Sequence, residues 1–105
     1  MKQYEVWRVN LDPTMGTEIN KTRPCLIISP DEINDNLNNV IVAPMTSTSK
    51  GYPSRVSVYF EGKNGYIVLD QIKTLDKIRF LKKLGSIDEK TIQLVKQVIQ
   101  EMLVD

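Results

Sequence analysis

The sequence contains no histidine and only one cysteine, Cys25. Without histidine, proton transfer must rely on carboxylates, hydroxyls, Tyr, Lys or Arg, and a His-rich metal site and a Ser-His-Asp triad are excluded. A single cysteine cannot form a disulfide within the chain, and its apolar neighbours favour a core position. The sequence also lacks a Walker A motif, a G-x-G-x-x-G loop and paired carboxylates at metal-ligand spacing. These absences exclude nucleotide hydrolases, zinc enzymes and most proteases.

Long hydrophobic runs and a signal-peptide pattern are also absent, so we expect a cytoplasmic protein without a membrane partner. The net charge is +1, which gives no overall bias toward nucleic acid, although a local basic patch would be sufficient to bind it. A chain of 105 residues with 41% hydrophobic and 26% charged residues is typical of one folded domain, which we take to span residues 1–105.

The most unusual stretch is Leu11–Pro30, LDPTMGTEINKTRPCLIISP. Its first half has the composition of a loop, with Pro13 and Gly16 among turn-forming residues. Its second half, Cys25–Ile28, is a continuous apolar run that predicts a strand buried on both faces. Such a loop delivers charged side chains to the edge of a core, where binding and catalytic residues concentrate. The alternative is a plain surface loop with Arg23 exposed or paired to Glu18.

Several other segments have the pattern of short strands. Alternation predicts strands at 4–9 and 55–60, and apolar runs predict buried strands at 40–43, which Pro44 would end, and at 66–69. The basic segment 73–83 includes a further strand, which Gly85 would end. No βαβ rhythm is present. The pattern therefore predicts an α+β fold, mainly β: a small, strongly bent antiparallel sheet or barrel closed by a C-terminal helix.

Two helices are expected. The first is short and starts near Ser29, which could cap it, with Pro30 at the first helical position. The second follows Gly85 and is capped by Ser86 or Asp88. It has one apolar stripe at helical spacing, suited to core packing or to a subunit contact. The residues of the stripe are Ile92, Val95, Val98, Ile99, Met102 and Leu103.

Polar groups lie at the ends of three predicted buried strands. Arg23 precedes one strand, Thr46 follows another and Asp70-Gln71 follow the third. If the sheet brings these ends together, they would surround one opening. An arginine fork binds phosphate with two hydrogen bonds and stabilises charge that develops on phosphorus oxygens. The alternatives are that Thr46 caps a turn and that Asp70 is paired to a basic neighbour.

The same residues, in their order and spacing, resemble the MazF/PemK toxin family. The matching segments are Leu11–Thr14, Gly16–Glu18, Thr22–Pro24 with the strand that follows, Val42–Thr46, Leu69–Ile72 and Thr74–Lys77. The resemblance implies an SH3-like barrel with a C-terminal helix, and a homodimer. It also implies a ribosome-independent endoribonuclease that cleaves single-stranded RNA at short sequences and is inhibited by a MazE-like antitoxin.

Carried over by position, the resemblance implies that Arg23 and Thr46 are catalytic and that Glu18 lies near Arg23. Asp70 matches an acid that some PemK-like members use. However, Thr17 stands where those members have histidine and Val68 where they have arginine. These departures favour the MazF-style arrangement built on Arg23 and Thr46.

We therefore expect transesterification by the RNA 2′-hydroxyl, without metal or cofactor, which gives 2′,3′-cyclic phosphate and 5′-hydroxyl ends. Arg23 would stabilise the transition state, Thr46 would hold a phosphate oxygen, and Glu18 would either orient Arg23 or act as base. RNA would lie in a groove at the dimer interface. The candidate RNA contacts are Thr17, Lys21, Ser47, Lys50, Arg55, Asp70, Gln71, Lys73, Lys77 and Arg79.

Two other interpretations remain open. A CcdB-like toxin has the same barrel but binds DNA gyrase without catalysis, and it would depend on the C-terminal helix rather than on Arg23. An SH3-like adaptor would need a peptide groove with more aromatic residues than the one Trp, four Tyr and two Phe present here.

Overall fold

The computed structural model describes residues 1–48 and 51–104. Its elements, in chain order, are β1 (Glu5–Asn10), β2 (Thr22–Ile27), α1 (Asp31–Asn36), β3 (Asn39–Thr46), β4 (Arg55–Phe60), β5 (Lys63–Val68), η1 (Leu69–Gln71), β6 (Lys73–Asp76), η2 (Lys77–Arg79), β7 (Phe80–Ser86), α2 (Glu89–Ile99) and the π-helical turn η3 (Gln100–Val104). No helix in these residues has the length and apolarity needed to cross a bilayer.

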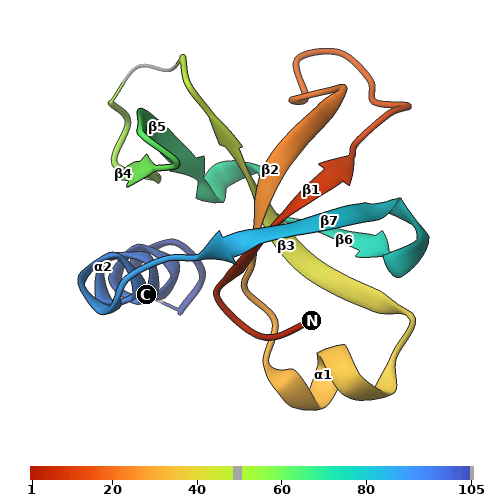
Figure 1. The fold of residues 1–105 in the computed structure, drawn as a ribbon. Coiled ribbons are helices and arrows are strands. Elements are labelled where there is room, and N and C mark those ends of the chain that lie inside the picture. The colour runs from red at the N-terminus through yellow and green to blue at the C-terminus, as the bar shows by residue number, and fades with distance from the viewer. Residues whose placement is uncertain (49–50, 105) are drawn as a thin grey trace.

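One antiparallel sheet forms the body of the molecule, with the strand order β4-β5-β3-β2-β1-β7. The long strand β3 pairs with β2 along one edge. Its other edge pairs first with β6, up to Val42, and then with β5, from Met45. Because two strands share this edge, the sheet splits and curls, with the β4–β5 hairpin on one side and β6 and β7 on the other (Figure 1). This half-barrel, with a single C-terminal helix, confirms the predicted fold class.

The sheet buries apolar side chains on both faces. Leu26 of β2 joins a cluster that packs against α2 through Val95, whereas Cys25 and Ile27 join a second cluster on the opposite face. All four side chains have no exposed surface. The prediction that Cys25–Ile28 is buried on both faces is therefore confirmed for β2, although Ile28 itself is only half-buried and lies after the end of the strand.

Several predicted boundaries are wrong, among them the start of the strand predicted at 66–69, since β5 already begins at Lys63. Strand β3 continues through Pro44, which lies between the ladders to β6 and β5, where the missing amide has no partner to lose on that edge. Gly85 lies inside β7 instead of ending it. Ser29 does not cap α1, whose N-cap is Pro30. The buried hydroxyl of Ser29 instead donates to Asn34 Oδ1 and accepts from the Ile41 amide.

Of the two caps predicted for the C-terminal helix, Ser86 and Asp88, the structure has Asp88. Asp88 is the N-cap, and its carboxylate accepts from the Thr91 amide at 2.8 Å. The apolar stripe packs on the core through Ile92, Val95, Val98 and Ile99, but η3 leaves Met102 38% and Leu103 65% exposed. The stripe therefore covers the core in α2 and becomes an exposed apolar end in η3.

Candidate active site

The pairing of β2 with β3 sets the positions of Arg23 and Thr46. Cys25 of β2 lies opposite Pro44 of β3. The same register, continued by two residues toward the strand ends, sets Arg23 opposite Thr46. Residues opposite each other on antiparallel strands point to the same face. Both side chains therefore belong to the face that contains Cys25, at the open end of the second core cluster.

Arg23 is half-buried and lightly bonded. Its Nε donates to the Asn20 carbonyl at 3.2 Å, and within the described residues neither terminal nitrogen has a protein partner. A guanidinium presents two parallel N–H donors that match two oxygens of a phosphate. Arg23 is thus held at its base and retains the donors that an anion requires.

Thr46 ends β3 in a tight turn. Its hydroxyl donates to the Thr48 carbonyl at 3.1 Å and accepts from the Thr48 amide at 3.3 Å. The predicted turn-capping role is therefore confirmed. To hold a phosphate oxygen, the hydroxyl has to exchange its donated bond for one to the ligand.

Gly65 allows β5 to approach this turn. Thr46 lies opposite Tyr66 in the β3–β5 pairing, and a Cβ built at Gly65 would lie 2.8 Å from the Thr46 carbonyl oxygen. That distance is too short for a side chain. Glycine at this position is therefore part of what holds Thr46 in place.

Side chains from η1, β6 and η2 brace the loop that leads to Arg23. Gln71 Oε1 accepts from the Ile19 amide at 2.9 Å, and Lys73 Nζ lies 3.2 Å from Glu18 Oε2. Arg79 donates to the carbonyls of Asn10 and Asp12. Three of the predicted RNA contacts thus hold the loop in the described structure.

Glu18 is not bonded to Arg23 in the described structure. Its carboxylate instead accepts from Lys73 and, at 3.3 Å, from the Met15 amide. Lys73 lies opposite Val42 and so shares the face of Arg23. Burial raises the pKa of the Cys25 thiol to about 12, and the nearby charge of Lys73 opposes this rise only in part. The Lys73 side chain therefore lies on the same face of the sheet as Cys25.

Asp70 does not contact Arg23 in the described structure and belongs to a separate cluster. Arg55 donates to both of its carboxylate oxygens, at 3.1 and 3.2 Å, and the Ser54 hydroxyl donates at 2.9 Å. The guanidinium beside Asp70 holds the pKa of that carboxyl below its usual value. The predicted opening thus contains Arg23 and Thr46, with Gln71 at the loop, while Asp70 is paired to a basic neighbour.

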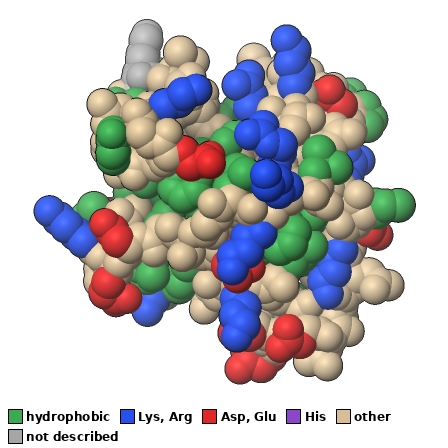
Figure 2. Space-filling model, viewed as in Figure 1, with side chains coloured by type: hydrophobic (Ala, Val, Ile, Leu, Met, Phe, Trp, Pro, Cys, Tyr) green, Lys and Arg blue, Asp and Glu red, His purple; other side chains and the backbone are tan. Residues whose placement is uncertain are grey.

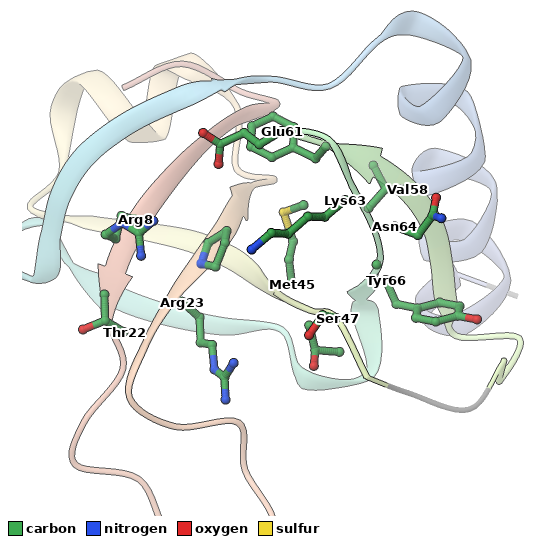
Figure 3. Close-up of a pocket in the computed structure, with 14 residues that line it drawn as sticks. Arg8, Thr22, Arg23, Met45, Ser47, Val58, Glu61, Lys63, Asn64 and Tyr66 are labelled. Atoms are coloured by element: carbon green, nitrogen blue, oxygen red, sulfur yellow. The ribbon is translucent and has the colours of Figure 1, made fainter.

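A cleft of about 480 Å³ opens beside Arg23 and Thr46 (Figure 3). Arg23, Thr46 and Ser47 form one rim, at the ends of β2 and β3. The rest of the lining comes from β1, from other residues of β2 and β3, and from the β4–β5 hairpin, and it includes Arg8 and Lys63. The cleft therefore connects the candidate catalytic pair to a second set of cations.

Sequence reasoning did not select this second set as functional. Arg8 had a detectable signal, because alternation in β1 places it on the side of Tyr4 and Val6, where a core residue is expected. Lys63 gave no such signal, because the predicted strands at 55–60 and 66–69 leave it between them, whereas the structure has a two-residue turn and places Lys63 in β5. The hairpin pairs Phe60 directly with Lys63 and so carries this lysine to the cleft.

The remaining candidates are dispersed. Thr17 and Lys21 are exposed in the loop before β2, whereas Lys77 donates to the Asn34 carbonyl near α1. Lys50 lies outside the described residues. Among residues 1–48 and 51–104, no three Cys, Asp or Glu side chains come together as possible metal ligands.

The fold and the cleft define a small half-barrel protein with an unsatisfied arginine beside a threonine at the sheet end. Residues 2–103 match the model of the PemK-like, MazF-like toxin of type II toxin-antitoxin systems. The chain therefore belongs to the MazF/PemK toxin family. It is 31% identical over 99 residues to the endoribonuclease toxin MazF of Escherichia coli K12, covering 93% of this chain and 88% of that protein. It is 33% identical over 105 residues to the endoribonuclease MazF of Staphylococcus saprophyticus, covering 94% and 88%.

Solved structures agree with this assignment. MazF from Deinococcus radiodurans superimposes with a TM-score of 0.88 at 25% identity, covering all of this chain and 97% of that chain. A MazE–MazF complex from the same organism matches with a TM-score of 0.82 at 25% identity, covering 99% and 96%. In that structure, the toxin is bound to its antitoxin.

Proposed function

We propose that this protein is the toxin endoribonuclease of a toxin–antitoxin pair. We propose that it cleaves single-stranded RNA and that Arg23 and Thr46 are its catalytic residues. The observation that supports this most is the β2–β3 register, which aligns an arginine with free terminal donors and a threonine hydroxyl at one rim of an open cleft. The relatives that are named endoribonucleases match over most of this chain.

The proposed reaction is transesterification without a metal ion. The RNA 2′-oxygen bonds to the adjacent phosphorus and loses its proton, while the bond to the 5′-oxygen breaks and that oxygen gains a proton. The products are a 2′,3′-cyclic phosphate and a 5′-hydroxyl. Negative charge on the phosphorus oxygens grows in the transition state, so fixed donors from Arg23 stabilise it more than the ground state. Thr46 donates to one of the same oxygens.

Glu18 has a positioning role in this proposal. Its carboxylate neutralises Lys73 and accepts from the Met15 amide, so it holds the loop before β2 against β6. Lys73, Gln71 and Arg79 then act on RNA chiefly through the shape of this loop. Thr17, Lys21 and Ser47 are the exposed candidates left to contact RNA directly. Arg55 and Asp70 are bonded to each other, so we leave them out of the RNA path.

The antitoxin and the homodimer are parts of the same proposal. A relative with the same fold is bound to MazE, and we propose that a MazE-like antitoxin inhibits this protein in the same manner. The exposed apolar side chains of η3, Met102, Leu103 and Val104, are suited to burial against a second copy. Light scattering coupled to gel filtration would test the dimer.

The alternative function, gyrase binding in the manner of CcdB, also draws on these exposed side chains at the C-terminal end. It gives no role to the open donors of Arg23. The family match favours the ribonuclease. A gyrase pull-down that succeeds with the Arg23→Ala variant, from a protein that cuts no RNA, would favour the alternative.

The decisive experiment is to incubate the purified chain with a long single-stranded RNA in EDTA, beside the Arg23→Ala variant, and to map the ends produced. We expect cuts at a few discrete sequences, with cyclic-phosphate and 5′-hydroxyl ends, which are lost in the variant. Cleavage that requires an added divalent cation would refute the metal-free mechanism. Cleavage that persists in the folded variant would refute the role of Arg23.

A further inference from the structure

The cleft beside the catalytic rim contains cations without protein partners. Arg8 of β1 and Lys63 of β5 both line it, and within the described residues neither side chain forms a hydrogen bond or an ion pair. In Figure 3 the Lys63 side chain extends over Met45 toward β2. The one carboxylate of the lining, Glu61, is exposed and unpaired in the described structure. The cleft thus has a net positive charge beyond Arg23.

A third cation continues this charge onto the neighbouring strand. Lys82 of β7 lies opposite Arg8 of β1, so both exposed side chains point to the same face. Like charges directly opposite each other destabilise a sheet, and no carboxylate offsets this pair in the part of the chain that the structure describes. By contrast, Lys83 on the other face is paired with Glu5 at 2.9 Å. Figure 2 shows Lys and Arg side chains gathered in a band down the middle of the visible face.

The floor of the same cleft is apolar. Met45 and Val58 line it and are almost fully buried, and the half-buried ring of Phe60 forms a wall. A Cβ at Gly85 would lie 3.4 Å from this ring, so glycine there leaves room for the ring to pack against β7. The cleft thus combines an apolar wall with unpaired cations at its edge.

We propose that this cleft is a nucleotide subsite for the RNA strand beyond the cleavage point. This inference rests on the proposed function. In the subsite, Arg8, Lys63 and Lys82 bind a phosphate other than the scissile one. The attached base packs against Phe60 and Met45. Single-stranded nucleic acids are bound in this way, by a basic groove that follows the backbone and by aromatic surfaces that receive bases.

The position of the cleft favours RNA over an acidic protein segment. Arg23 and Thr46 lie at one rim, and the Arg23 side chain is directed away from the interior of the cleft (Figure 3), so a strand held by Arg23 for cleavage continues over this rim into the cleft. The subsite therefore increases the affinity of the enzyme for the RNA that it cleaves. It predicts that the enzyme needs RNA on one particular side of the bond that it cuts.

The test combines protein variants with RNA length. Once cleavage mapping has given a substrate, kcat and KM are measured for the wild type and for the Arg8→Gln/Lys63→Gln variant. The RNAs are the full substrate and versions shortened from either end toward the cleavage point. The control is the Lys2→Gln/Lys90→Gln variant, which also loses two exposed positive charges but lines neither rim of the cleft. Melting curves check that each variant is folded.

For the full RNA, we expect kcat/KM of the Arg8→Gln/Lys63→Gln variant to fall roughly 10-fold, mostly through KM. Shortening the RNA from one end should cause the same loss in the wild type but little further loss in the variant. The slope of log kcat/KM against log salt should become less steep by about 0.7 for each phosphate that the variant no longer neutralises. The control variant should show the wild-type dependence on RNA length.

Equal losses on long and short RNAs, or no loss relative to the control, would overturn the subsite and leave the proposed function standing. Normal RNA cleavage together with lost binding of a polyglutamate peptide would assign the cleft to an acidic protein segment and would also overturn it. A folded wild type that cuts none of the RNAs would overturn the proposed function, and the subsite with it.

Discussion

Two arginines at strand ends, Arg23 and Arg55, differ in how their donors are used. Arg55 gives two hydrogen bonds to Asp70, and its guanidinium carbon lies 5.0 Å from the centre of the Tyr52 ring. Arg23 gives one bond from Nε to a backbone carbonyl, and its terminal nitrogens have no protein partner in the described structure. The two residues have the same side chain, but Asp70 already occupies the Nε–Nη2 edge of Arg55, whereas both terminal nitrogens of Arg23 lack a protein partner in the described structure.

The difference shows how to separate a structural arginine from a functional one. A guanidinium that presents its Nε–Nη2 edge to a carboxylate no longer has that two-donor edge for a phosphate, and binding a phosphate there would mean breaking the ion pair. A guanidinium fixed only at its base is oriented without being satisfied, which suits a group that stabilises a transition state. Substitutions on the two sides test this distinction, from the largest expected effect to the smallest.

The Arg23→Lys substitution tests whether the fork matters more than the charge. Lysine keeps the positive charge but cannot present two parallel donors, so kcat/KM should fall roughly 100-fold while the melting temperature stays the same. Arg55→Lys is the matched control, and it should keep the activity and lose stability instead. Initial rates on one RNA and melting curves distinguish the two. If the Arg23→Lys variant cleaved RNA at the wild-type rate, the conclusion that Arg23 is functional and Arg55 structural would be wrong.

Gly65→Ala tests the scaffold on the Arg23 side of the comparison. The new methyl group would lie 2.8 Å from the Thr46 carbonyl oxygen, so β3 and β5 must move apart. Overpacking of this kind costs about 1–3 kcal/mol of unfolding free energy and should also lower the cleavage rate through Thr46. Urea unfolding measures the cost. Gly51→Ala, where no atom of the described residues beyond the chain neighbours lies within 4 Å of the new atom, should leave stability and rate unchanged, and an equal loss there would contradict the steric argument.

Asp70→Asn tests the Arg55 side. The hydrogen bonds from Arg55, followed by that from Ser54, lower the pKa of Asp70 in the folded state, while burial opposes them. The ionised carboxylate therefore stabilises the fold above its ordinary pKa of 3.8, and this contribution disappears as the pH falls through the lower folded pKa. Because Asp70 is 36% exposed, we expect a loss of only about 1 kcal/mol at pH 7, with cleavage unaffected.

Urea unfolding of the wild type and Asp70→Asn at pH 7 and at progressively lower pH measures this contribution. The two proteins should differ at pH 7 and converge once Asp70 is protonated. A constant difference at every pH would mean that the carboxylate charge has no part in it. A large loss of cleavage would return Asp70 to the active site.

The β2 strand shows how much sequence patterning predicts. An unbroken apolar run after Arg23 predicts a strand buried on both faces, and the structure has Leu26 on one core and Cys25 on the other. The ends of β3 show why boundaries are harder. Pro44 ends a strand only if its amide is needed, and that depends on how β5 and β6 share one edge. Sheet edges are set by distant segments and are invisible in local sequence.

Within the site, the sequence predicted where side chains lie better than it predicted which side chains bond to each other. Arg23 and Thr46 were placed together from strand ends and family motifs, and the register agrees with that placement. The partner of Glu18 was not predicted, because Lys73 lies 55 residues away and reaches the loop only through the β3–β6 pairing. The same holds for Lys63, which the hairpin carries to the cleft. Pairwise contacts of this kind require the tertiary fold.

The smallest expected effect concerns Glu18, whose role the motif left open between orientation and general base. Its ion pair with Lys73 is half-exposed on the Glu18 side, so Glu18→Gln should cost about 0.5 kcal/mol of stability. If Glu18 only holds the loop, kcat should stay within about threefold of the wild type and the pH–rate profile should keep its shape, because no titrating catalytic group is lost. Lys73→Gln, which removes the other partner, should give the same small change. A drop of roughly 100-fold in Glu18→Gln alone, with the acidic limb of the profile gone, would instead make Glu18 the base and would join it to Arg23 as a working pair.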